Sequence, residues 1–81
     1  MRLTKNNLAK MEAKFYGISQ EDMESMVHKW MANEDYNRLH VAYWALDDFV
    51  CAISLRQEVY EFLRDNHMAP EGRTNAEYRG L

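Results

Sequence analysis

Apolar side chains are concentrated in one stretch of the chain, residues 39–55, which reads LHVAYWALDDFVCAISL. Placed on a helix, this stretch carries two apolar stripes. One consists of Leu39, Ala42, Tyr43, Leu46, Phe49, Val50 and Ile53, and the other of Val41, Trp44, Ala45, Cys51, Ala52 and Leu55. A helix that is apolar around most of its circumference needs cover on both faces. The pattern therefore predicts a central helix around which the rest of the chain is organised.

Two amphipathic helices are predicted before this stretch. Thr4 and Ser19 are suitable N-caps for them, and Gly17 is placed to end the first in a left-handed conformation. The apolar stripe of the first helix is Leu8, Met11 and Phe15. The stripe of the second follows the i, i+3, i+4, i+7, i+8 spacing of a buried helix face and consists of Met23, Met26, Val27, Trp30 and Met31. We expect the second helix to end near Ala32 or Asn33.

The segment that follows allows two interpretations. No Gly or Pro stands between Gly17 and Pro70, so one helix from Tyr36 to Asn66 would be roughly 45 Å long. Alternatively, Asp47 and Asp48 cap a new helix and divide the segment near its middle, with Ser54 as a second candidate break. In both cases the sequence predicts an all-α fold, a small bundle of three to four helices with a central apolar helix. The expected helical domain covers residues 1–67, and a short irregular C-terminal tail covers residues 68–81.

Charge is unevenly distributed along this chain of 81 residues and net charge −3. Residues 1–16 hold four basic residues and one acidic residue, whereas residues 17–35 hold five acidic residues and one basic residue. This polarity favours antiparallel packing of the two segments or a charged partner.

Cysteine content and hydropathy bear on the compartment. The single cysteine, Cys51, excludes an internal disulfide and fits a reducing compartment. The N-terminal residues hold no signal-peptide core, and residues 39–55 are shorter than the roughly 20 residues of a membrane span. We therefore expect a cytoplasmic protein that does not bind a membrane.

The pattern Ala13-x-x-x-Gly17-Ile18-Ser19-x-x-x-Met23-x-x-Met26 resembles a helix-turn-helix motif. With the residues that follow it, it is similar to the small helix-turn-helix modules of phage terminase small subunits and transposases. The resemblance implies a DNA-binding or DNA-packaging accessory protein, and the lysines of the basic first helix would contact phosphates: Lys5, Lys10 and Lys14. The would-be recognition helix, however, begins Gln20-Glu21-Asp22 and continues with Glu24, and DNA repels carboxylates there. DNA binding is therefore the alternative function.

Candidate catalytic and metal-binding groups are few. Asp47 and Asp48, together with His40, could perform acid–base chemistry if burial raised the pKa of one carboxyl group. Adjacent residues on a helix point about 100° apart, so the two aspartates do not share one site. A helix cap, a helix break or a buried ion pair explains them more simply. The histidines and Cys51 show no zinc-finger spacing, and no Gly-rich phosphate loop is present. The sequence therefore predicts no enzyme, no metal site and no cofactor.

The cover available to the central helix indicates the class of function. Two short amphipathic helices cover one of its faces, and residues 56–66 add cover if the helix breaks. The stripe that contains Val41, Trp44, Cys51 and Leu55 would then remain exposed. Soluble monomers seldom expose such a patch, and Trp and Tyr are enriched at interface hot spots.

We therefore expect a small protein–protein interaction module, a homodimeric adaptor or inhibitor of a larger protein complex. The small size, the lack of catalytic motifs and the aromatic-rich central helix would suit a protein that a phage or mobile element encodes and that binds a host complex. The predicted partner-binding residues are Tyr36, Tyr43, Trp44 and Asp48 on the central helix and Tyr78 and Arg79 in the tail.

Overall fold

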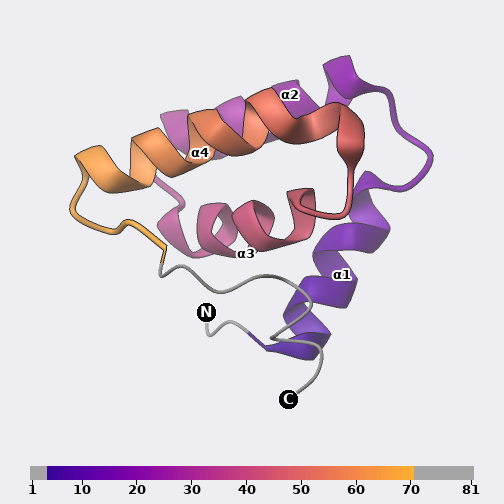
Figure 1. Ribbon diagram of the computed structural model, residues 1–81, viewed down its shortest axis with the longest axis horizontal. Helices are drawn as coiled ribbons and strands as arrows, with labels where there is room; N and C mark the ends of the chain where they lie inside the picture. The colour runs from indigo at the N-terminus through magenta and orange to yellow at the C-terminus, as the bar shows by residue number, and fades with distance from the viewer. Residues whose placement is uncertain (1–3, 71–81) are drawn as a thin grey trace.

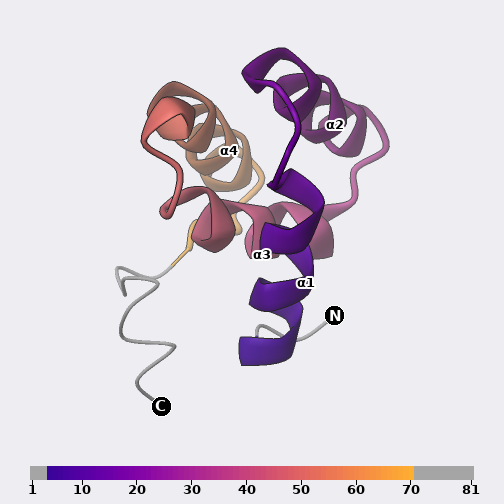
Figure 2. The same cartoon turned by 90° about the vertical axis from the view of Figure 1, so that its right-hand side faces the viewer.

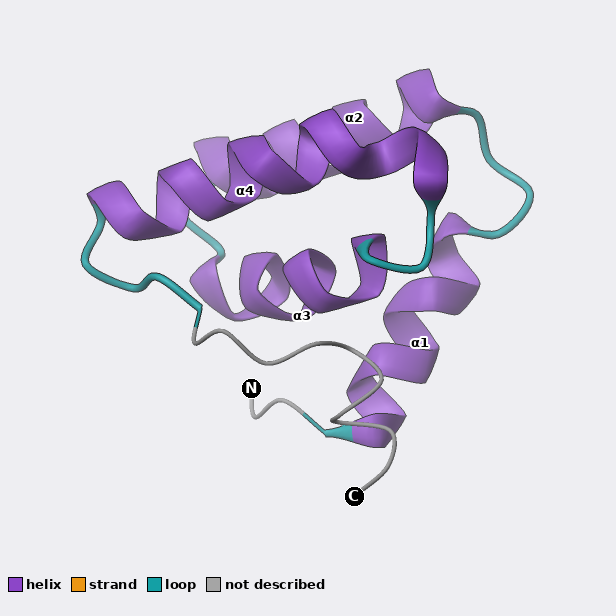
Figure 3. Cartoon of the chain, in the orientation of Figure 1, coloured by secondary structure: helices purple, strands orange, loops and turns teal. Residues whose placement is uncertain are grey.

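A computed structural model describes residues 4–70, and within this range it contains four α-helices, one 3₁₀ turn and no strand. The helices are α1 (Lys5–Phe15), α2 (Gln20–Ala32), α3 (Tyr36–Leu46) and α4 (Ile53–Asp65), and the 3₁₀ turn η1 (Val50–Ala52) directly precedes α4 (Figures 1 and 3). The predicted all-α fold class is confirmed. None of the helices in the described range has the length and the apolar run that a membrane crossing requires.

The N-caps predicted for the first two helices, Thr4 and Ser19, are confirmed by capping contacts, and Asp35 caps the third helix in the same way. Three side-chain oxygens accept a hydrogen bond from the backbone N–H three residues further on: those of Thr4 (3.2 Å), Ser19 (3.1 Å) and Asp35 (3.2 Å). Each bond satisfies an N–H group that the first turn of a helix leaves unpaired. Gly17 has a φ of 78° and follows the end of α1, because a residue without a Cβ adopts the left-handed conformation at little steric cost.

α3 is the central helix and contacts each of the other three. α2 and α4 lie side by side against α3, and α1 runs crosswise to all three (Figures 1 and 2). The antiparallel packing of the first two segments that the charge pattern favours is not formed. α1 packs mainly against α3, because its apolar stripe finds the larger apolar surface there.

The predicted central helix is interrupted at Asp47 and Asp48, where the chain turns. α3 ends at Leu46, the two aspartates form a turn, and α4 starts after η1 and runs back along α3 (Figure 3). The divided helix is therefore the correct alternative, and a single helix from Tyr36 to Asn66 is wrong. The aspartates do not cap the new helix, since neither η1 nor α4 has a side-chain cap at its N-terminus.

This reversal of the chain covers the stripe that we expected to remain exposed. Val41 is 1% exposed, Trp44 2% and Leu55 0%, whereas Cys51 is exposed. The expectation that a partner is needed to bury this stripe is therefore wrong. The break lets α4 supply the second cover within one chain. The predicted stripes of the first two helices supply the rest of the core, with Leu8, Met11 and Phe15 from α1 and Met23, Val27 and Trp30 from α2.

Candidate functional site

Large apolar side chains are exposed together where α1 ends and where α3 turns into α4. Val50 is 86% exposed, Tyr16 69% and Ile53 68%. Phe49 is half-buried and links them, because its ring meets the ring of Tyr16 edge-on with the centroids 5.5 Å apart. We call Tyr16, Phe49, Val50 and Ile53 the corner surface.

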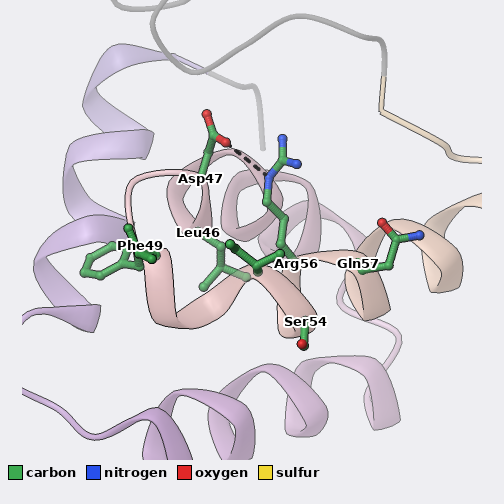
Figure 4. Close-up of a pocket in the computed structure, with 8 residues that line it drawn as sticks. Leu46, Asp47, Phe49, Ser54, Arg56 and Gln57 are labelled. Carbon is green, nitrogen blue, oxygen red and sulfur yellow. Dashed lines mark ion pairs between the residues drawn. The ribbon is translucent and has the colours of Figure 1, made fainter.

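An open hollow of 710 Å³ adjoins the corner surface (Figure 4). Its lining consists of Leu46, Asp47, Phe49, Val50, Ile53, Ser54, Arg56 and Gln57. Asp47 and Arg56 form a loose ion pair in the wall, with Oδ1 of the carboxylate 3.8 Å from Nε of the guanidinium. The corner surface thus places protruding apolar side chains beside a concave wall that carries charges of both signs.

Contacts with α1 and α3 hold this region in place. The ring of Phe49 stands perpendicular to that of Phe15 with the centroids 6.0 Å apart, which ties the turn to α1. Nε of Arg56 donates a hydrogen bond of 3.1 Å to the carbonyl of Tyr43, one of the four carbonyls that the end of α3 leaves without a helical partner. The exposed apolar side chains therefore belong to a packed turn and not to a frayed helix end.

Three of the predicted partner-binding residues hold the bundle together. Trp44 is buried in the core. Tyr43 is half-buried beneath Arg56, whose Cζ lies 3.9 Å from the centroid of the tyrosine ring. Tyr36 is half-buried and stacks on Phe62 with the ring centroids 5.9 Å apart, which joins the start of α3 to α4. In the single chain, these three side chains are engaged in packing between helices.

The other three predicted residues divide between the turn and the C-terminal segment. Asp48 is exposed in the turn next to the corner surface. Tyr78 and Arg79 lie outside the described residues. Of the predicted set within the described range, Asp48 is thus the residue that the fold places beside the exposed apolar side chains.

The sequence prediction missed Val50 and Ile53 for a geometric reason. On a continuous helix both belong to the same stripe as Leu46, which is buried. The turn at Asp47 and Asp48 changes the helical phase, so residues after it point in new directions. The only signal in the sequence for the exposure of Val50 and Ile53 was the pair of aspartates. If the helix ends at these aspartates, the residues after them can no longer be assigned to the stripes of a continuous helix.

The groups considered for acid–base chemistry are not gathered into one site. His40 is half-buried on α3; burial lowers the pKa of its imidazole, and a hydrogen bond with the backbone of Met68 raises it by less. Asp47 and Asp48 lie about two helical turns away, roughly 10 Å along the axis. Between residues 4 and 70, no three His, Cys, Asp or Glu side chains converge in the way that a metal ion needs.

The lysines expected to contact DNA are all exposed on α1. Lys10 and Lys14 line a second hollow together with Arg38 of α3, while Lys5 is not part of its lining. Ala13 is exposed in the same lining. The small residue of the motif therefore does not pack between α1 and α2, as it does where a helix-turn-helix locks its second helix.

No protein-family model, no curated protein and no solved structure matches the chain.

Proposed function

We propose that the protein is a small non-enzymatic protein–protein interaction module that self-associates through the corner surface and acts as an adaptor or inhibitor of a larger protein complex. The observation that supports this function best is the exposure of Tyr16, Val50 and Ile53 in one packed region. Clusters of exposed apolar side chains on small soluble domains mark binding sites. Each Val or Ile side chain that a partner buries contributes roughly 1.5–3 kcal/mol.

A second copy of the chain is the partner that the corner surface fits. Val50 is 86% exposed and is itself part of the lining of the hollow, whose wall also holds the carboxylate of Asp47 and the guanidinium of Arg56. In a two-fold arrangement the same patch faces itself, so the protrusion of one protomer lies opposite the hollow of the other. Asp47 then lies opposite the partner's Arg56. If the lining carried charges of one sign only, two copies would repel each other at this surface, whereas the carboxylate of Asp47 and the guanidinium of Arg56 can attract each other across the interface.

The size of the surface limits the affinity. Stable complexes bury about 800 Å² per partner, and four apolar side chains supply only part of that area. Polar residues around the hollow, such as Ser54 and Gln57, supply the remainder. We therefore expect a dimer of micromolar affinity that dissociates readily. Such a dimer leaves the corner surface accessible to a larger complex, as an adaptor or inhibitor requires.

Sedimentation equilibrium of the wild type and of Val50→Asp, Ile53→Asp and Met68→Asp tests self-association. The wild type is expected to show a mass that rises with concentration towards a dimer. Val50→Asp and Ile53→Asp are expected to remain monomeric with an unchanged helical circular dichroism spectrum, because an unpaired carboxylate is costly to bury. Met68→Asp is the matched control, since Met68 is 41% exposed and lies outside the corner surface.

Two results contradict self-association through this surface: a wild-type chain that stays monomeric at every concentration, and a Val50→Asp chain that dimerises like the wild type. The adaptor or inhibitor role is tested separately, with Val50→Asp and Met68→Asp as paired baits. A protein that Met68→Asp retains and Val50→Asp loses supports the role. A protein that both variants retain contradicts the assignment of that contact to the corner surface.

A further inference from the structure

A second hollow, of 350 Å³, lies between α1 and α3, and its lining is basic. The lining residues are Asn7, Lys10, Met11, Ala13, Lys14 and Arg38. Three of these six side chains carry a positive charge and none carries a negative charge. The volume lies at the lower end of the range of about 300–1,000 Å³ that small-ligand sites occupy.

This concentration of positive charge runs against the charge of the chain as a whole, which is −3. Lys10 and Lys14 are one helical turn apart and therefore lie on the same face of α1. Arg38 comes from another helix and adds a third cation, whose charge Asp35 balances in part, whereas Lys10 and Lys14, at i and i+4 on α1, repel each other. An anion bound among the three would relieve this repulsion.

Contacts within the chain hold two of the cations beside the hollow. Nζ of Lys14 lies 5.9 Å from the centroid of the Trp30 ring. Nη1 of Arg38 donates a hydrogen bond of 2.9 Å to Oδ2 of Asp35, which is not part of the lining. A guanidinium has five N–H donors, so one bond to Asp35 orients the group and leaves donors for a ligand. These two side chains are therefore partly ordered before any ligand arrives.

We propose that this hollow binds the phosphate group of a phosphate-bearing ligand. Ammonium and guanidinium groups form charge-assisted hydrogen bonds with phosphate oxygens, and Arg presents its donors in a fork that matches two of them. Met11 and Ala13 add apolar surface for the uncharged part of the ligand. Both lysines of the hollow, Lys10 and Lys14, were predicted from the sequence to contact phosphate, whereas Arg38 reaches the same place only through the packing of α1 on α3. A nucleic-acid backbone and a free phosphate compound share this chemistry.

The test uses three probes on the full chain: sodium phosphate, adenosine monophosphate and a fluorescently labelled DNA duplex. Backbone amide chemical shifts are followed during the two small-molecule titrations, with sodium chloride keeping the ionic strength constant. The fluorescence anisotropy of the duplex is followed over a series of salt concentrations. Lys10→Gln and Arg38→Gln are compared with Lys29→Gln, which removes one exposed cation from α2. Circular dichroism checks that all three variants remain folded.

We expect saturable shifts at Asn7, Lys10, Lys14 and Arg38. Lys10→Gln and Arg38→Gln should each weaken the affinity by about tenfold or more, the effect of losing one charge-assisted hydrogen bond, whereas Lys29→Gln should change it by less than about twofold.

Two positive outcomes distinguish the sources of phosphate. Duplex binding whose salt dependence decreases by about one unit of slope for each removed cation supports the proposal and identifies nucleic acid. Saturation by phosphate or adenosine monophosphate without duplex binding supports it and identifies a free phosphate compound. The absence of saturable change with all three probes at low salt overturns the proposal. An equal loss of affinity in Lys29→Gln also overturns it, because that result reports only net charge.

Discussion

Arg56 covers the aromatic ring of Tyr43 and also donates a hydrogen bond to its backbone carbonyl. Cζ of the guanidinium lies 3.9 Å from the ring centroid, and Nε lies 3.1 Å from the carbonyl oxygen. The same Nε is 3.8 Å from Oδ1 of Asp47, whose negative charge at the C-terminus of α3 is unfavourable to the helix dipole. One side chain from the first turn of α4 thus completes the end of α3 and stabilises the turn that reverses the chain.

Replacement of Arg56 should therefore destabilise the fold. Arg56→Ala is expected to lower the free energy of unfolding by about 1–2 kcal/mol, through loss of the cation–π contact and of the hydrogen bond to the carbonyl of Tyr43. Arg56→Lys should recover only part of this loss, because an ammonium lacks the planar fork of a guanidinium. Urea unfolding followed by circular dichroism measures both variants.

The matched control for Arg56 is Arg64→Ala. Arg64 is 54% exposed at its side chain and pairs with its neighbour Asp65 at 3.4 Å. An exposed pair of this kind contributes little, so the change should stay below about 0.5 kcal/mol. Equal effects of the two alanine substitutions would show that Arg56 does not hold the turn.

Truncation of Trp44 and of Val50, both in the apolar stretch, should change the free energy of unfolding by very different amounts. Trp44→Ala is expected to cost about 3–5 kcal/mol, because it removes a side chain that is 2% exposed and leaves a cavity in the core. Val50→Ala should change the free energy of unfolding by less than about 0.5 kcal/mol, since Val50 is 86% exposed. Thermal and urea unfolding measure both effects. A Trp44→Ala chain as stable as the wild type would contradict the packing described for α3.

Stability should fall with acidification through His40. Burial lowers the pKa of this imidazole below its ordinary value of 6.5, and the hydrogen bond with the backbone of Met68 offsets only part of that effect. The unfolded chain therefore binds a proton more readily than the folded chain. The free energy of unfolding is then fully developed above pH 6.5 and decreases as the pH falls from 6.5 towards the lower pKa of the folded state.

The measurement for His40 is urea unfolding at about pH 7.5 and about pH 5.5, on either side of the ordinary pKa of histidine. His40→Gln should show a smaller loss of stability between the two values than the wild type. His67→Gln, at an exposed position, is the matched control and is expected to keep the wild-type dependence. An unchanged pH dependence in His40→Gln would contradict the assignment.

The sequence by itself determined the first two helices of this protein and most of the core residues that they contribute. Capping by Thr4 and Ser19, the ending of α1 at Gly17 and the spacing of the apolar residues all depend on neighbours within about four positions. Interactions over such short separations can be derived from the order of residues alone. Of the predicted α2 stripe, Met23, Val27 and Trp30 are buried in the core, and Met26 and Met31 are half-buried against it.

The tertiary structure alone decided which apolar side chains remain in contact with water. The sequence left open whether the helix ends at Asp47 and Asp48, because both the long helix and the divided one agree with the residue spacing and the lack of Gly and Pro in this segment. The break brings α4 back onto α3, buries Trp44 and turns Val50 and Ile53 outward. A change of direction at one turn moves every later residue relative to the bundle, and only contacts between distant segments, such as that of Arg56 with Tyr43, fix that direction.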